Sequence, residues 1–158
     1  MITHNKTVKE LIIEDVEKAC KVIKRINGFD NNIEVVERWD QQGNDKAVIP
    51  CLFIHTGNET KENRPSLVTG CTLTVHLDLW TVHDKEKYPG STDGLLNSFA
   101  YDIEKAVMKD IQRNNLAERT TVMSIDLFET VEGQPYAGVI ATLEIKYKHK
   151  TGDPKTQL

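Results

Sequence analysis

The chain has 158 residues, of which 39% are hydrophobic and 28% are charged, and it carries a formal net charge of −4. This length and composition are typical of one globular domain and exclude a disordered or fibrous protein. The negative net charge argues against tight binding of DNA or RNA, because nucleic-acid binders neutralise phosphates with clustered Lys and Arg. We expect one domain over residues 1–150 and a frayed tail over residues 151–158, which has nothing to pack against.

The sequence predicts neither a membrane anchor nor an export signal. The longest apolar stretches, residues 48–54 and 73–79, are far too short to cross a bilayer, and the first ten residues lack an apolar signal core. We therefore expect a protein that stays in the cytoplasm where it is made.

The cysteines do not have the pattern of a disulfide framework or a metal site. Cys20, Cys51 and Cys71 are odd in number, widely spaced and flanked by apolar residues. We interpret all three as small core residues, because free cysteine is among the most buried residue types.

The first predicted element is a helix over residues 7–27. Thr7 and Glu10 have the spacing of a capping box, in which each side chain accepts a hydrogen bond from a backbone N–H at the helix start. Apolar residues then recur at three- and four-residue steps and form one stripe. Gly28 is suited to end the helix in a left-handed conformation.

Two strands follow, over residues 33–39 and 48–55, and a polar stretch around Gly43 is predicted to join them as a hairpin. Pro50 has no N–H to donate to a neighbouring strand. We therefore expect an edge or a bulge at that point of the second strand.

Residues 56–70 are polar and rich in turn-forming residues, which predicts a long loop. Long loops in compact domains are usually functional or mobile. We expect this loop to be mobile in the free subunit and to contact partners. The residues that we select there are Asn58, Glu59 and Arg64.

The next strand, over residues 71–82, alternates more regularly than any other. Its apolar face comprises Cys71, Leu73, Val75, Leu77 and Leu79. The other face includes His76, Asp78 and Trp80. A purely solvated face has little reason to contain a tryptophan, so we expect this face to lie partly against a neighbouring subunit.

A second helix is predicted from Ser91 or Thr92 to residue 114, with its acidic residues on an ordinary solvated face. These residues are Asp102, Glu104 and Asp110. Two final strands are predicted over residues 120–131 and 136–148, joined by a turn.

The predicted order of elements is α-β-β-β-α-β-β. Strands that follow one another through hairpins favour an antiparallel sheet. We therefore predict an α+β fold in which a mostly antiparallel sheet of about five strands has two helices packed on one face.

The most enzyme-like feature is the pair His76 and Asp78 on one strand face. With a distant histidine at position 55, 83 or 149, this pair could form an open iron site. Any polar strand face with His and Asp gives such a match, and the sequence has neither a glycine-rich phosphate loop nor a nucleophile motif. We predict no enzymatic activity and no bound metal or cofactor.

Four segments together resemble a known family. They are the amphipathic first helix; residues 47–54 (AVIPCLFI); the strand at residues 73–80 (LTVHLDLW) with the helix that follows it through Leu95-Leu96 and residues 106–110; and the final strand at residues 137–147 (AGVIATLEIKY). Over about residues 8–148, the chain resembles the tail terminator, or tail-completion, proteins of long-tailed bacteriophages.

The resemblance implies a structural virion protein. Its copies would form a ring, typically of six, that caps the tail tube, ends its polymerisation and provides the surface for joining the head. The implied partners are the tail tube protein and the head-tail connector, and DNA would pass through the ring without tight binding. The protein would be found in the host cytoplasm during assembly and then at the head-proximal end of the tail.

The residues expected at an interface with another subunit or with the tail tube are Trp80, His76, Asp78, Asn58, Glu59 and Arg64. The resemblance brings no catalytic residues with it. Three alternatives stay open: another phage neck or head-tail connector protein, a non-phage binding module, and a small cytoplasmic metal-dependent enzyme that uses His76 and Asp78.

Overall fold

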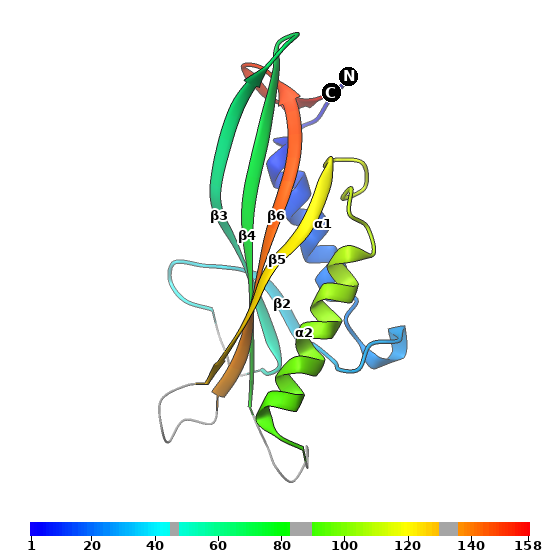
Figure 1. Ribbon diagram of the computed structural model, residues 1–158, viewed down its shortest axis with the longest axis vertical. Helices are drawn as coiled ribbons and strands as arrows, with labels where there is room; N and C mark the ends of the chain where they lie inside the picture. The colour runs from blue at the N-terminus through cyan, green and yellow to red at the C-terminus, as the bar shows by residue number, and fades with distance from the viewer. Residues whose placement is uncertain (45–47, 83–89, 130–135) are drawn as a thin grey trace.

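The computed structural model describes residues 1–44, 48–82, 90–129 and 136–158. It is a curled, half-barrel sheet with two helices along its inner side (Figure 1). The described strands are β1 (Ile2–Thr3), β2 (Val35–Arg38), β3 (Cys51–Arg64), β4 (Val68–Val82), β5 (Arg119–Glu129), β6 (Tyr136–Lys150) and β7 (Asp153–Gln157). The helices are α1 (Val8–Lys21) and α2 (Thr92–Met108), and a short 3-10 helix spans Arg25–Asn27.

The sheet has the strand order β1-β7-β6-β4-β3-β2. Strand β5 is not part of this order and pairs with β6. All described pairs are antiparallel except β2 and β3, which run parallel from the pair Val35 and Cys51 to the pair Arg38 and Ile54. The strands β4 and β6 are paired over their whole lengths and form the centre of the sheet.

The predicted fold class is wrong. Strands make up 46% of the described residues and helices 24%, so the fold is mostly β, with seven described strands rather than about five. The two additional strands are β1 and β7, and β7 lies in the tail that was predicted to fray. Their backbones pair with each other, and Thr156 is only 2% exposed.

The region of residues 33–70 also differs from its prediction. The expected hairpin between the first two strands is a parallel pair. The expected loop over residues 56–70 is not a loop, because β3 and β4 continue through it as a long hairpin with a turn at residues 65–67. A bulge between Thr56 and Glu59 marks the start of this extension. Residues 56–68 of this region are exposed or half-buried, so few of these positions require an apolar side chain.

The alternation in β4 is confirmed, and β6 repeats it. The inward residues of both strands are buried and join the helices in one core. The residues contributed by β6 are Ala137, Val139, Ala141, Leu143, Ile145 and Tyr147. The three cysteines are buried, as predicted.

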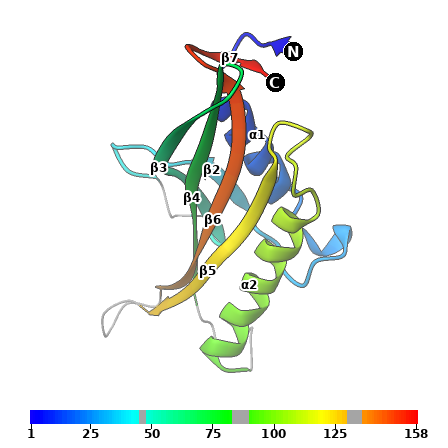
Figure 2. The ribbon, with the colours of Figure 1, turned by 45° about the horizontal axis from the view of Figure 1, so that its top comes forward.

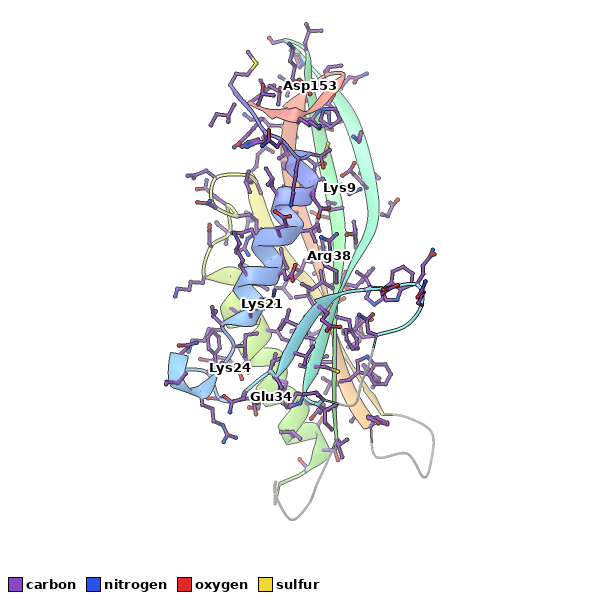
Figure 3. All side chains as sticks on the ribbon, turned by 180° about the vertical axis from the view of Figure 1, so that it is seen from behind. Lys9, Lys21, Lys24, Glu34, Arg38 and Asp153 are labelled. Atoms are coloured by element: carbon purple, nitrogen blue, oxygen red, sulfur yellow. The ribbon has the colours of Figure 1, made fainter. Side chains whose placement is uncertain are left out.

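Helix α1 begins as predicted, because the Thr7 hydroxyl accepts a hydrogen bond from the Glu10 N–H at 3.2 Å. It is shorter than expected, and the 3-10 helix that follows ends at Gly28, whose φ is +87°. An ion pair of 2.8 Å between Glu10 and Arg38 joins α1 to β2. Figure 3 labels Arg38, seen from behind the molecule.

Helix α2 ends at Met108 and not at residue 114. Positive φ values of 50° to 63° at Arg113, Asn114 and Asn115 turn the chain there. The prediction for Asp102 is also wrong, because this residue is completely buried. No helix in the described part of the chain is long and apolar enough to span a membrane.

Candidate functional site

The sheet face turned away from α1 and α2, here called the open face, carries three of the six residues selected from the sequence, namely His76, Asp78 and Trp80. Pairing between the strands arranges this face in rows. One row is Cys51, Trp80, Gly138 and Phe128; the next is Phe53, Asp78, Ile140 and Asp126; the third is His55, His76, Thr142 and Ser124. His76, Asp78 and Trp80 therefore share one face, as the alternation of β4 predicted.

Trp80 lies in an aromatic cluster on the open face. Its ring meets the ring of Phe128 edge-on, with 4.8 Å between centroids and 68° between planes, and lies 6.4 Å from the ring of Tyr136. The contact between the two rings requires a glycine at position 138. A Cβ there would lie 2.2 Å from Phe128 Cζ and 2.1 Å from the Leu79 carbonyl oxygen. Phe128 on β5 thus crosses β6 to hold Trp80 in place.

Asp78 lies against a histidine from the neighbouring strand. His55 Nε2 is 2.9 Å from Asp78 Oδ2, and His76 Nδ1 is 3.2 Å from the hydroxyl of Thr142. Burial raises the pKa of Asp78 above its usual value, although the two histidines oppose the shift. The carboxylate is therefore partly desolvated, and a nearby positive charge would stabilise its ionised form.

Trp39, the first residue after β2, also belongs to this group of side chains. Its backbone N–H donates to the Ile54 carbonyl at 2.9 Å, which continues the parallel pairing by one residue. The indole ring then stacks on His55, with 5.2 Å between centroids and 27° between planes, while half of the residue stays exposed.

These side chains surround a cavity of about 260 Å³, here called the aromatic cavity. Its described lining residues are Trp39, Gly43, Asn44, Phe53, His55, Asp78 and Trp80. Three aromatic side chains and one carboxylate thus face the same small space.

The extension of β3 and β4 beyond Thr56, here called the arm, carries the other three residues selected from the sequence. The arm rises past the body of the sheet to the end of the molecule where both termini lie (Figures 1 and 2). Ser66 and Leu67 at its tip have φ values of 65° and 58°, and Leu67 is 71% exposed. A bulky residue with positive φ is uncommon, so the tip presents an apolar side chain at some cost in backbone strain.

The three selected arm residues have different surroundings. Asn58 is exposed. Glu59 turns toward the helices, accepts a hydrogen bond of 2.7 Å from Tyr147 Oη and has a side chain only 11% exposed. Arg64 is paired with Glu62 at 2.7 Å and with Glu118 at 3.1 Å.

Of the three histidines named as a further metal ligand beside His76 and Asp78, one lies against Asp78 in the described part of the chain. His55 contacts Asp78, whereas His149 lies 3% exposed on the inner face, near Lys61, and His83 lies outside the described residues. Within residues 1–44, 48–82, 90–129 and 136–158, no group of three or more His, Cys, Asp and Glu side chains is placed to hold a metal ion.

Sequence reasoning missed the contributions of Trp39, Phe53, Phe128 and Tyr136 to this site. The alternation in β4 indicated only its own residues. The other contributions depend on how the strands pair, which the alternation of a single strand does not contain. Gly138, inside a strongly alternating strand, did indicate that another group approaches the backbone closely there.

Comparisons with known proteins do not extend this description. No protein-family model and no curated protein matches the chain. Its function is therefore inferred from the geometry of the open face, the arm and the sheet edges.

Proposed function

We propose that the protein is a structural subunit that assembles with its own copies into a ring and works as the resemblance to phage tail terminators implies. Such a ring would cap the tail tube, end its polymerisation and provide the surface for joining the head. Its partners would be the tail tube protein and the head-tail connector, with DNA passing through the ring. Six copies is the number that the resemblance implies.

The observation that carries this proposal is the hairpin β3–β4, which holds all six residues selected as interface residues. Beyond Ile54, no described strand pairs with the outer edge of β3, whereas its inner edge pairs with β4, which pairs in turn with β6. An unpaired edge is a template for pairing with another chain, and the charges of Lys61, Glu62 and Arg64 and the bulge after Thr56 restrict which strand could pair with this one. A long edge that is left open is consistent with use in assembly.

The far side of the sheet offers a matching element. Strand β5 pairs with β6 on one edge, and no described strand pairs with its other edge. Met123 and Leu127 on β5 are 56% and 39% exposed. Contacts between two different edges of neighbouring copies are head-to-tail, and head-to-tail contacts close into rings when the rotation permits.

The test uses the exposed tip of the arm, where a substitution removes no internal contact. Leu67→Asp places a charge at the tip, and Asp tolerates positive φ better than Leu does. We expect the wild type to sediment as one oligomer of defined mass and Leu67→Asp to sediment as a folded monomer with an unchanged circular dichroism spectrum. The matched control is Ile26→Asp, which changes an equally apolar, 92% exposed residue away from the hairpin.

Two results would contradict the proposal. One is a wild type that stays monomeric at all concentrations tested, alone and with the tail tube protein. The other is a Leu67→Asp variant that assembles as well as Ile26→Asp does. Trp80 lies on the open face, but Trp80→Ala is a poor test of assembly. The substitution also removes the contacts of Trp80 with Phe128 and Tyr136, and their loss weakens folding.

A further inference from the structure

We propose that the aromatic cavity is a binding site for an organic cation, an alkylammonium or guanidinium group. This inference goes beyond the proposed ring and does not depend on it, because every residue of the cavity comes from one chain. It rests on the side chains that line the cavity, on their charge and on the volume that they enclose.

The walls have the chemistry that attracts such a group. The faces of Trp, Tyr and Phe rings carry partial negative charge and attract cations placed within about 6 Å of the ring centre, with Trp the strongest. Two tryptophans, Trp39 and Trp80, line the cavity together with Phe53. Phe53 lies on β3, Trp80 on β4 and Trp39 directly after β2, and Phe128 supports Trp80 from the side.

Asp78 gives the site its charge preference. Its side chain is 24% exposed, lines the cavity and keeps one carboxylate oxygen 2.9 Å from His55. Burial disfavours the charged form of this carboxylate even beside His55, and a bound cation would stabilise that form. An anionic ligand would meet this carboxylate, and no Lys or Arg is among the described lining residues.

The volume limits the size of the ligand. Pockets for drug-sized molecules usually measure about 300–1,000 Å³, and this cavity has about 260 Å³. It therefore suits a group of a few heavy atoms, such as a methylated ammonium or the end of a basic side chain. A free amine and a Lys or Arg side chain of a neighbouring copy share this chemistry.

The chain offers a direct spectroscopic test. It contains only two tryptophans, and both line the cavity. Choline should therefore change the intrinsic fluorescence saturably. Its uncharged isostere, 3,3-dimethylbutan-1-ol, should have no saturable effect at the same concentrations, with ionic strength held constant by NaCl. Ethylguanidinium serves as the guanidinium probe.

Substitutions assign the effect to the cavity. We expect Asp78→Asn and Trp39→Ala each to weaken choline binding by about tenfold, which corresponds to the loss of one good charge or ring contact. Trp39→Phe should weaken it less. The matched control is Asp126→Asn, an exposed aspartate in the same row of the open face, which should bind choline as the wild type does.

The titration is performed on both the wild type and Leu67→Asp, so that a neighbouring copy cannot hide the cavity. If a neighbour's side chain normally fills the site, choline should dissociate the oligomer over the range in which it saturates the fluorescence. If a free amine fills it, the oligomer should be unchanged.

The inference is overturned if choline and its neutral isostere act alike, if neither binds to Leu67→Asp, or if Asp126→Asn weakens binding as much as Asp78→Asn does. A monomeric wild type that binds choline would contradict the proposed ring and leave the cation site standing. If the wild type forms a defined ring but Leu67→Asp does not bind choline, the proposed ring stands and the cation site is wrong.

Discussion

At the scale of single residues, Asp102 shows how a charged side chain can belong to the core. Its carboxylate is completely buried and accepts hydrogen bonds of 2.9 Å from the backbone N–H groups of Asp30 and Asn31 and from the Asn31 side-chain amide. Asp102 therefore holds the loop before β2 against α2, together with Ser98 and Lys105, which bond Asn31 and Gly28 at 2.8 Å.

We predict that Asp102→Ala lowers the free energy of unfolding by about 3 kcal/mol, because it leaves several buried donors without an acceptor. Urea unfolding followed by circular dichroism would measure the change. Glu104→Ala, which alters an exposed residue on the same helix, should stay within about 0.5 kcal/mol of the wild type. Equal effects of the two substitutions would show that Asp102 does not organise the loop.

Residue patterns predicted part of the candidate site. The period of two in β4 correctly placed His76, Asp78 and Trp80 on one face, because a half-buried strand in the core must alternate. The same reasoning failed for Asp102, because its position on an amphipathic helix gave no sign of the three donors that surround it. It could not find Trp39 either, since that contact depends on the parallel pairing of β2 with β3.

At the scale of elements, the C-terminal strand β7 is an integral part of the sheet. It pairs with β1 and with the end of β6, and the Thr156 hydroxyl is 2.9 Å from the hydroxyl of Thr3. The His4 N–H also donates to the Lys155 carbonyl at 2.9 Å. The N-terminal segment is thus held in place by the C-terminal one.

We predict that ending the chain at Thr151 lowers the free energy of unfolding by about 1–3 kcal/mol, since it removes a few net-stabilising hydrogen bonds. It should also expose the His4 amide to rapid hydrogen exchange, which nuclear magnetic resonance would detect. Lys155→Ala keeps the backbone bond and should preserve the protection. Unchanged protection of His4 in the shortened chain would mean that β7 contributes nothing to β1.

The elements that were predicted well and badly differ in their burial. Strands β4 and β6 and the start of α1 carry strong local signals: alternation in the strands and a capping box in the helix. The β3 part of the arm is polar on both faces, and β7 is very short. Neither segment therefore shows the alternation of polar and apolar residues that would predict a strand. Their pairing is determined by the neighbouring strands β4 and β6, which is information that no local pattern contains.

At the scale of the whole molecule, the arm is linked to the body of the fold through Glu59. The carboxylate accepts from Tyr147 Oη on β6 at 2.7 Å, and Oε2 lies 3.7 Å from Nζ of Lys9 on α1. Lys61, two residues further along β3, is 3.3 Å from the other carboxylate oxygen. One side chain therefore joins the base of the arm, the centre of the sheet and the first helix (Figure 3 labels Lys9).

These contacts predict a dependence of stability on pH. Burial alone would raise the pKa of Glu59, but the hydrogen bond from Tyr147 and the charges of Lys9 and Lys61 outweigh it and hold the pKa below its usual value of 4.5. A carboxylate whose pKa is lowered by folding stabilises the folded state above its unfolded pKa. That contribution is lost as the pH falls from 4.5 through the lower pKa of the folded state.

We predict that Glu59→Gln lowers the free energy of unfolding by about 1 kcal/mol at pH 7, because the glutamine keeps an acceptor for Tyr147 but loses the charge. The difference from the wild type should shrink once the pH is below 4.5 and disappear when Glu59 is protonated in both states. Urea unfolding at pH 7, 5, 4 and 3 would measure it. Glu62→Gln on the same strand removes an exposed carboxylate and should change little at any pH, since exposed ion pairs contribute little. An equal difference between Glu59→Gln and the wild type at pH 7 and pH 3 would show that the charge of Glu59 does not hold the arm to the body.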